Sequence, residues 1–140
     1  MADAGERAGF TFNFDGKRIM INSFDLHRLL MWAREEDKQT ELKLAFFEAH
    51  FTDLKYLNQE DALLDVLERV GLNKDTARDI LHSDKYVQAV REEQNNFKQM
   101  GITSVPTFII NDKYALTGGQ PSESFIQALK QISEEEAKQD

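Results

Sequence analysis

Most of this chain spaces its apolar residues as a helix requires. Between residues 22 and 100 they recur every three or four positions, the interval at which side chains share one helical face. Residues that typically cap or stop helices separate these stretches. The pattern predicts five helices: one that begins at Asn22 or Ser23, one capped by Thr40, one from about Gln59 to Val70, a short one from Asn73 to about His82, and one capped by Ser83 and stopped by Gly101, with Tyr86, Val90, Phe97 and Met100 pointing inward.

The end of the chain follows a different pattern. A β-rich run, residues 107–110, comes directly after Val105-Pro106 and is joined to a second run, residues 113–117, by Asn111-Asp112. This arrangement predicts a β-hairpin. A last helix should begin at Ser122, with an apolar face that consists of Phe125, Ile126, Leu129 and Ile132.

Before residue 22 the pattern is weaker. Residues 1–9 are small and polar, so we expect a disordered lead-in. Three phenylalanines then alternate with polar residues over 10–14 and meet Asp15-Gly16, which suggests a short hairpin. The chain therefore divides into a lead-in over residues 1–21, a helical region over 22–100 and a ββα region over 101–140.

The net charge and the hydropathy of the chain disfavour two classes of binding partner, nucleic acids and membranes. The formal net charge is −8, which disfavours binding to nucleic acid or to an anionic membrane. No apolar run approaches the roughly 18 residues that a membrane-spanning helix needs. The N-terminal residues lack the basic start and apolar stretch of a signal peptide. We therefore expect a soluble, cytoplasmic protein with no nucleic-acid or membrane partner.

No residue pattern in this chain predicts a catalytic or metal site. The chain contains no cysteine, which excludes disulfides, thiolate chemistry and cysteine-ligated zinc within it. Its histidines, His27, His50 and His82, fall on three different predicted helices without the spacing of a zinc site. No glycine-rich phosphate loop is present. We accordingly predict no catalytic residue and no metal ligand in these 140 residues.

The Val105-Pro106 pair is the one feature that could serve a ligand. Proline cannot donate to a sheet ladder, so it belongs at the first residue of a strand, at an edge or in a turn. One interpretation is a simple strand-entry proline. The other is a cis proline that presents the neighbouring backbone to a ligand.

Three segments resemble one protein family. Residues 101–129, GITSVPTFIINDKYALTGGQPSESFIQAL, resemble the C-terminal half of DsbA-like thioredoxin-fold proteins, in the branch of FrnE-type disulfide isomerases and 2-hydroxychromene-2-carboxylate isomerases. Residues 22–33 and 45–72 resemble the helical domain inserted in that branch. The resemblance implies a mostly α-helical chain with a small β-hairpin: a helical insertion domain followed by the C-terminal ββα half of a thioredoxin fold.

The resemblance also implies a binding site. Pro106 matches the family's cis proline and Val105 the residue before it, whose backbone pairs with bound peptide or glutathione in the family. Val105 and Pro106 are therefore the predicted substrate-binding residues. The resemblance admits glutathione as a cofactor, and it implies a peptide or thiol substrate for the complete protein.

The chain differs from the family in the segment that carries the redox cysteines. It has no Cys-x-x-Cys, and its first residues already resemble the middle of family members, so we expect a fragment that lacks the N-terminal half. Three functions follow. The chain could be part of a thiol-disulfide oxidoreductase or isomerase, inactive alone. It could be part of a glutathione-dependent isomerase or transferase, or it could be a non-catalytic protein-binding module.

A final expectation concerns association. In a complete thioredoxin core, the strand that follows the cis proline lies beside the first strand. Without that strand, residues Phe108–Ile110 should expose an open edge, which favours a homodimer. The alternatives are that the helical region folds over the gap or that the Phe10–Phe14 segment docks there as a surrogate strand.

Overall fold

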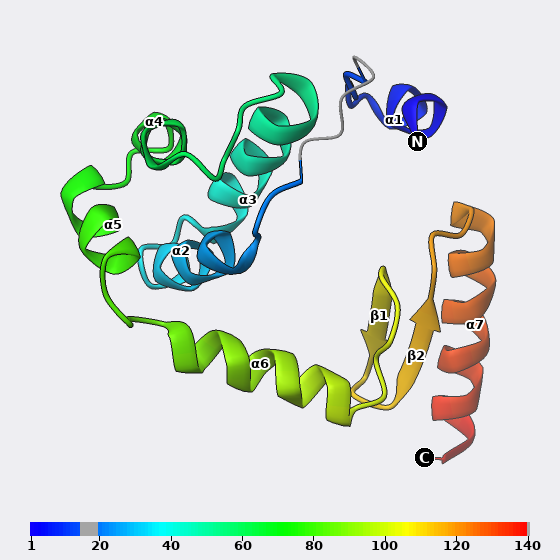
Figure 1. Cartoon of the computed structure of the whole chain (residues 1–140). Coiled ribbons are helices and arrows are strands. Elements are labelled where there is room, and N and C mark those ends of the chain that lie inside the picture. The colour runs from blue at the N-terminus through cyan, green and yellow to red at the C-terminus, as the bar shows by residue number, and fades with distance from the viewer. Residues whose placement is uncertain (15–19, 140) are drawn as a thin grey trace. The chain divides into compact units, whose positions relative to one another are not determined.

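The computed structural model describes residues 1–14 and 20–139. Within these residues the chain is mostly helical, with a two-stranded antiparallel sheet near its C-terminal end (Figure 1). This confirms the predicted fold class. The chain divides into two compact units, Met1–Glu93 and Gln94–Asp140, and each is described by itself.

The core of the first unit is formed mainly by four α-helices and one π-helical turn. They are α2 (Phe24–Glu35), α3 (Gln39–Phe47), η1 (Glu48–Thr52), α4 (Glu60–Arg69) and α5 (Lys74–Leu81). Helix α2 packs against α3 and α5, and α4 packs against the same two helices. Their apolar faces meet in one core of buried side chains: Leu26, Leu29, Trp32, Ala33, Leu42, Phe46, Ala49, Leu57, Leu63, Leu64, Val66, Leu67, Leu72, Ala77 and Ile80.

Local polar groups set where these helices begin and end. The Asn22 side chain accepts a hydrogen bond from the Phe24 N–H at 3.1 Å, and Asn73 accepts one from the Thr76 N–H at 2.9 Å. Gly71 lies just after the C-terminal end of α4 and has a positive φ of 81°, a conformation that glycine adopts without strain. The predicted starts of α2 and α5 are confirmed, whereas α3 begins at Gln39, one residue before the predicted cap, Thr40.

Arg28 is a charged side chain inside this apolar packing. Only 4% of it is exposed, and its guanidinium donates hydrogen bonds to the carbonyls of Ile80, Ser83 and Lys85. Asp25, one turn earlier on α2, pairs with it at 2.9 Å. The side chain therefore ties α2 to backbone carbonyls at the end of α5 and in the turn that follows it.

The expected disordered lead-in is wrong, because the first residues form helix α1 (Ala2–Ala8). Gly9 ends this helix at φ 76°, and the Phe10 N–H donates to the Gly5 carbonyl at 2.8 Å. Gly5 is buried, and a Cβ atom at this position would lie 2.7 Å from the Phe10 carbonyl oxygen. The turn that follows α1 thus packs directly on the bare backbone of Gly5 and holds the helix in place.

The Phe10–Phe14 segment does not form the predicted strand. Its residues have no regular secondary structure, and the Asp15-Gly16 turn lies outside the described residues. The segment instead docks on η1, where the Asn13 N–H donates to the Phe51 carbonyl at 2.8 Å. The Phe12 ring meets the Phe51 ring edge-on, with 5.4 Å between centroids. Aromatic packing and this hydrogen bond replace pairing with a second strand.

Helix α6 (Val87–Gln99) begins later than predicted. The Ser83 hydroxyl donates to the Ile80 carbonyl and accepts from the Lys85 N–H, so it stabilises a turn rather than capping α6. Tyr86 has a positive φ of 64° and lies before the helix. The prediction that Phe97 and Met100 point inward is also wrong, because 45% and 59% of these residues are exposed.

The second unit contains the end of α6, a β-hairpin and one further helix. Strands β1 (Thr107–Ile110) and β2 (Tyr114–Thr117) pair antiparallel, with Phe108 opposite Leu116. Both Asn111 and Asp112 have positive φ, as the predicted tight turn requires. Helix α7 (Ser122–Gln139) runs alongside the hairpin (Figure 1).

The division between the units falls inside α6, not after residue 100 as the sequence pattern suggests. The Gly101 and Ile102 N–H groups donate to the carbonyls of Lys98 and Phe97. These bonds join the last turn of α6 to the loop that follows it. Over the part of the chain that the structure describes, no helix has both the length and the apolar character that a membrane crossing requires.

We predict that Arg28→Ala destabilises the first unit by about 3 kcal/mol, because buried carbonyls lose charge-assisted donors. Arg34→Ala is the matched control: Arg34 lies on the same helix but is exposed, so its loss should cost under about 0.5 kcal/mol. Urea unfolding followed by circular dichroism measures both. Equal stability of the two variants would contradict the role of Arg28.

Candidate functional site

Val105 and Pro106 lie in the loop that leads from α6 into β1. Val105 is 90% exposed, Pro106 is also exposed, and the peptide bond between them is cis. Hydrogen bonds hold the loop on either side. The Pro106 carbonyl accepts from the Gly118 N–H at 2.8 Å, and the Thr107 hydroxyl donates to the Ser104 carbonyl at 2.7 Å.

The backbone of Val105 itself is unpaired. Among the described residues, no hydrogen bond reaches its N–H or its carbonyl. A backbone donor and acceptor that are held in place but unpaired can bind the backbone of an extended ligand. The structure therefore places both predicted site residues together at the entry to β1, on an anchored loop.

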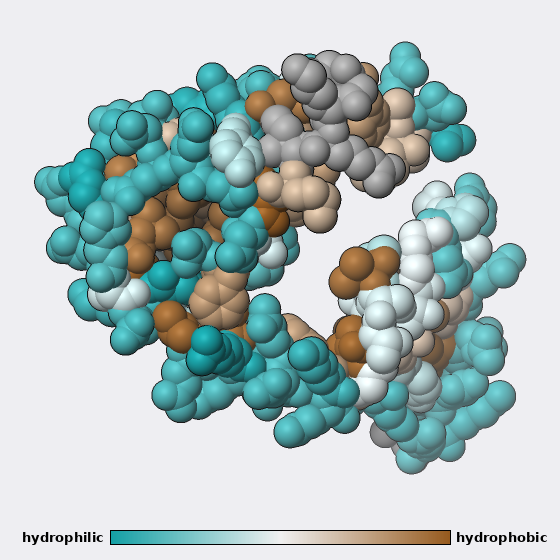
Figure 2. Space-filling view, in the orientation of Figure 1, coloured by the Kyte–Doolittle hydropathy of each residue, from teal (hydrophilic) through white to brown (hydrophobic). Residues whose placement is uncertain are grey.

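One face of the hairpin packs on α7 and the other does not. Phe108 contacts Phe125 of α7 edge-on, with 4.8 Å between ring centroids, and Ile132 is 9% exposed. The predicted apolar face of α7 is only partly covered, because Ile126 and Leu129 remain about half exposed. In Figure 2 the region of the hairpin shows separate hydrophobic patches among atoms of intermediate hydropathy.

A polar cluster fixes the far end of the hairpin to α7. The Tyr114 hydroxyl donates to Glu136 at 2.9 Å, and the Lys113 ammonium donates to Glu136 at 3.1 Å and to Gln139 at 2.7 Å. The hydrogen bond from Tyr114, followed by that from Lys113, lowers the pKa of Glu136. The same carboxylate raises the pKa values of Tyr114 and Lys113.

Sequence reasoning missed this cluster, although a signal exists. Glu136 lies four residues after Ile132, on the face of α7 that packs on the sheet. Tyr114 lies opposite Ile110 and two residues before Leu116, so the strand alternation places it on that same side of the hairpin. The cluster orients the hairpin and thereby the loop that carries Val105.

The histidines do not converge. His82 pairs with Glu60 at 2.7 Å between Nε2 and Oε2, and His50 carries a buried Nδ1 without a hydrogen-bond partner in the described part of the chain. Within residues 1–14 and 20–139, no group of three or more histidine or carboxylate side chains could hold a metal ion.

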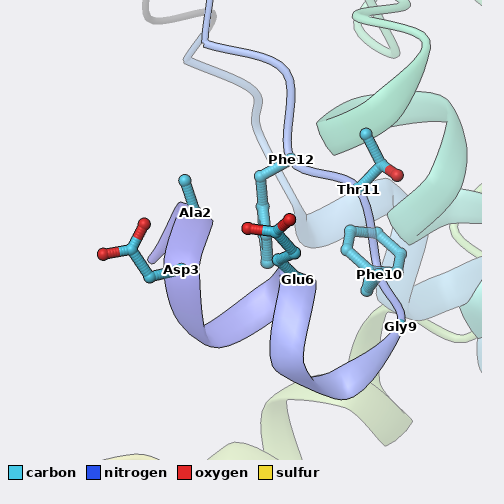
Figure 3. Close-up of a pocket in the computed structure, with 7 residues that line it drawn as sticks. All are labelled: Ala2, Asp3, Glu6, Gly9, Phe10, Thr11 and Phe12. Carbon is cyan, nitrogen blue, oxygen red and sulfur yellow. The ribbon is translucent and has the colours of Figure 1, made fainter.

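Two of the hollows in the first unit combine acidic and apolar side chains. One, of about 430 Å³, lies against α1 and is lined by Ala2, Asp3, Glu6, Gly9, Phe10, Thr11 and Phe12; Figure 3 shows the Asp3 carboxylate pointing away from the two rings. The other, of about 330 Å³, is lined by Asn22, Asp25, Leu26, Leu57, Asn58, Glu60, Leu63, Leu81 and His82. Neither is lined by a cysteine, a serine or a lysine that could act as a nucleophile. The Val105 loop is the candidate site.

Comparison with known proteins identifies the family. Residues 1–130 match the DSBA-like thioredoxin domain. This chain is a member of that family. The match includes the whole helical region, the Val105 loop, the hairpin and the first half of α7.

Two relatives show how far the likeness extends. The uncharacterized protein YwbO of Bacillus subtilis (strain 168) is 30% identical over 108 residues, which cover 76% of this chain and 52% of YwbO. The crystal structure of the probable DsbA oxidoreductase SCO1869 from Streptomyces coelicolor matches with a TM-score of 0.83 and 29% identity, covering 93% of this chain and 56% of that one. The chain thus spans about half the length of these relatives and has a DsbA-like fold with a helical insertion.

We predict that Tyr114→Phe raises the pKa of Glu136 toward its ordinary value of 4.5, because the donor that most favours the charged carboxylate is lost. The lowered pKa stabilises the fold above the ordinary pKa, and this contribution disappears as the pH falls through the folded-state value. Carboxyl carbon NMR over a pH series measures it. Tyr56→Phe, which removes a hydroxyl that contacts Asn58 instead, should leave the Glu136 titration unchanged. An unshifted Glu136 in Tyr114→Phe would contradict the assignment.

Proposed function

We propose that this chain forms the substrate-binding part of a thiol-disulfide oxidoreductase of the FrnE-type branch. Membership of the DSBA-like family and the similarity to a probable DsbA oxidoreductase support the reaction class. The resemblance of residues 101–129 supports the branch. The observation that carries the proposal is the exposed, unpaired Val105 backbone on a loop that is anchored on both sides.

The chemistry divides into two tasks. In thiol-disulfide exchange, a thiolate attacks one sulfur of a disulfide, a new S–S bond forms and the other sulfur leaves as a thiolate. This chain has no cysteine, so it cannot supply the attacking sulfur. Its task in the proposal is to hold the substrate backbone beside a thiolate that belongs to residues outside these 140. Alone, the chain is inactive.

The surroundings of Val105 favour a backbone ligand over a charged one. From Gly101 to Ile110 the chain contains no charged side chain. An extended peptide can therefore pair with the Val105 N–H and carbonyl and rest on apolar side chains. Glutathione is itself a peptide and offers backbone groups of this kind beside its own charged ends. The substrate class in the proposal is an extended peptide that carries a thiol or disulfide.

We predict that glutathione and a neutral six-residue peptide shift the NMR signals of Ser104 to Thr107 when added to this chain. Val105→Pro, which removes the N–H donor, should weaken binding about tenfold, as expected for one lost hydrogen bond. Val105→Thr keeps the backbone and the branched shape, so its affinity should match the original.

Cross-strand contacts between Thr107 and Thr117 show whether each variant keeps the hairpin. If the hairpin is intact and Val105→Pro binds as well as the original chain, Val105 is not the binding residue. Signal changes confined to the helical unit would also exclude this site.

A further inference from the structure

A hollow of about 270 Å³ lies along one face of α4. It is lined by Lys55, Ala62, Asp65, Val66 and Arg69. Ala62, Val66 and Arg69 are spaced by four and then three residues, so they share one face of the helix. The volume is just below the roughly 300–1,000 Å³ of drug-sized binding sites. The hollow therefore suits a small organic ligand.

Two apolar side chains form part of the lining. Val66 is 2% exposed and belongs to the core of the first unit. Ala62, one turn earlier, carries only a methyl group and leaves room beside Val66. An apolar group that displaces water from these two side chains gains free energy through burial of apolar surface. One end of a fitting ligand is therefore apolar.

Lys55 reaches the hollow from an anchored loop between η1 and α4. Its N–H donates to the Ala49 carbonyl at 2.7 Å, and Leu57, two residues later, is 2% exposed. The backbone is thereby fixed on both sides of the lysine side chain. Within residues 1–14 and 20–139, the Lys55 ammonium takes part in no ion pair. The hollow thus contains a cation whose charge is not used by a neighbouring carboxylate of the described residues.

The other charges around the hollow favour an anion with one charge. Asp65 pairs with Lys74 at 3.3 Å, which offsets its repulsion of an anion. The Arg69 guanidinium approaches Asp53 at 4.0 Å, a long separation for an ion pair, and has further N–H donors. A carboxylate fits this arrangement better than a phosphate monoester, because a second negative charge would face Asp65.

We propose that this hollow binds a small organic carboxylate with an apolar tail, such as hexanoate. The carboxylate lies between Lys55 and Arg69, and the tail lies on Ala62 and Val66. Planar carboxylates suit the fork of an arginine side chain, and the lysine adds a point charge. The site uses no residue of the Val105 loop, so it does not depend on the proposed function, and loss of peptide binding at Val105 would leave it intact.

Titration of the 140-residue chain with sodium hexanoate, at constant ionic strength, tests the proposal through the amide NMR signals of Ala62 and Val66. Hexan-1-ol has the same tail without the charge and should bind about fivefold more weakly. Acetate has the charge and almost no tail. It should bind more than about tenfold more weakly, because each buried methylene raises the affinity by up to about fourfold.

Two substitutions separate the charge from the space. Lys55→Gln removes the unpaired cation and should weaken hexanoate binding about threefold to tenfold. Lys43→Gln is the matched control, because Lys43 is exposed on α3, does not line the hollow and changes the net charge equally. Ala62→Leu fills the hollow with a good helix former and should abolish binding, with circular dichroism as the check that the helices form.

Equal affinities of Lys55→Gln and Lys43→Gln would overturn the proposal, and this pair decides alone if Ala62→Leu does not fold. Hexanoate binding to folded Ala62→Leu as tight as to the original chain would overturn it as well, as would signal changes confined to residues outside 55–69. The protein from its native cells that contains this sequence should rank the three ligands in the same order. Absence of hexanoate binding there would also contradict the proposal.

Discussion

The helical unit depends on the contact between the buried guanidinium of Arg28 and the backbone at the end of α5. From α2 it reaches the carbonyls at the end of α5 and in the turn that follows, while Asp25 balances its charge. Charges are seldom buried unless their donors are used, and here the donors are used on the Asp25 carboxylate and on backbone carbonyls at the end of α5 and in the turn after it. Burial of the apolar core supplies the stability of this unit, whereas Arg28 fixes the path of the backbone after α5.

A second polar contact supports the same turn. The Tyr86 hydroxyl donates to Glu35, at the other end of α2, at 2.6 Å, and this bond raises the pKa of Tyr86 to about 12. Tyr86 has the positive φ that ends the turn before α6 begins. Arg28, in the second turn of α2, and Glu35, at the C-terminal end of α2, thus both hold this turn. In the second unit, Glu136 acts similarly on the hairpin by holding both Lys113 and Tyr114.

The sequence predicted the helices and turns that depend on interactions between residues close together in the chain. Apolar spacing and the side chains of Asn22 and Asn73 located α2 and α5, and Asn111-Asp112 located the hairpin turn. The proline at a strand entry, together with the family resemblance, pointed to Val105 and Pro106.

What the sequence did not predict depends on contacts between distant residues. Helix α1 is polar and short, and it persists because Gly5 lies under the turn that follows. The π-helical turn η1 is closed by a hydrogen bond from the Asp53 N–H to the Glu48 carbonyl. The spacing of apolar residues does not predict such a turn. Phe97 lies on the apolar face predicted for its helix, but it is 45% exposed. The spacing of apolar residues does not show whether another helix or strand covers that face.

The central claim is that these 140 residues bind the substrate while the reactive thiolate lies outside them. Insulin reduction by dithiothreitol, followed by turbidity, tests this on the 140-residue chain and on the protein from its native cells that contains this sequence. The account predicts the uncatalysed rate for the chain and a faster rate for the native protein, whose peptide map should include a Cys-x-x-Cys. Acceleration by the 140-residue chain, or a native protein that has no cysteine pair and no activity, would contradict it.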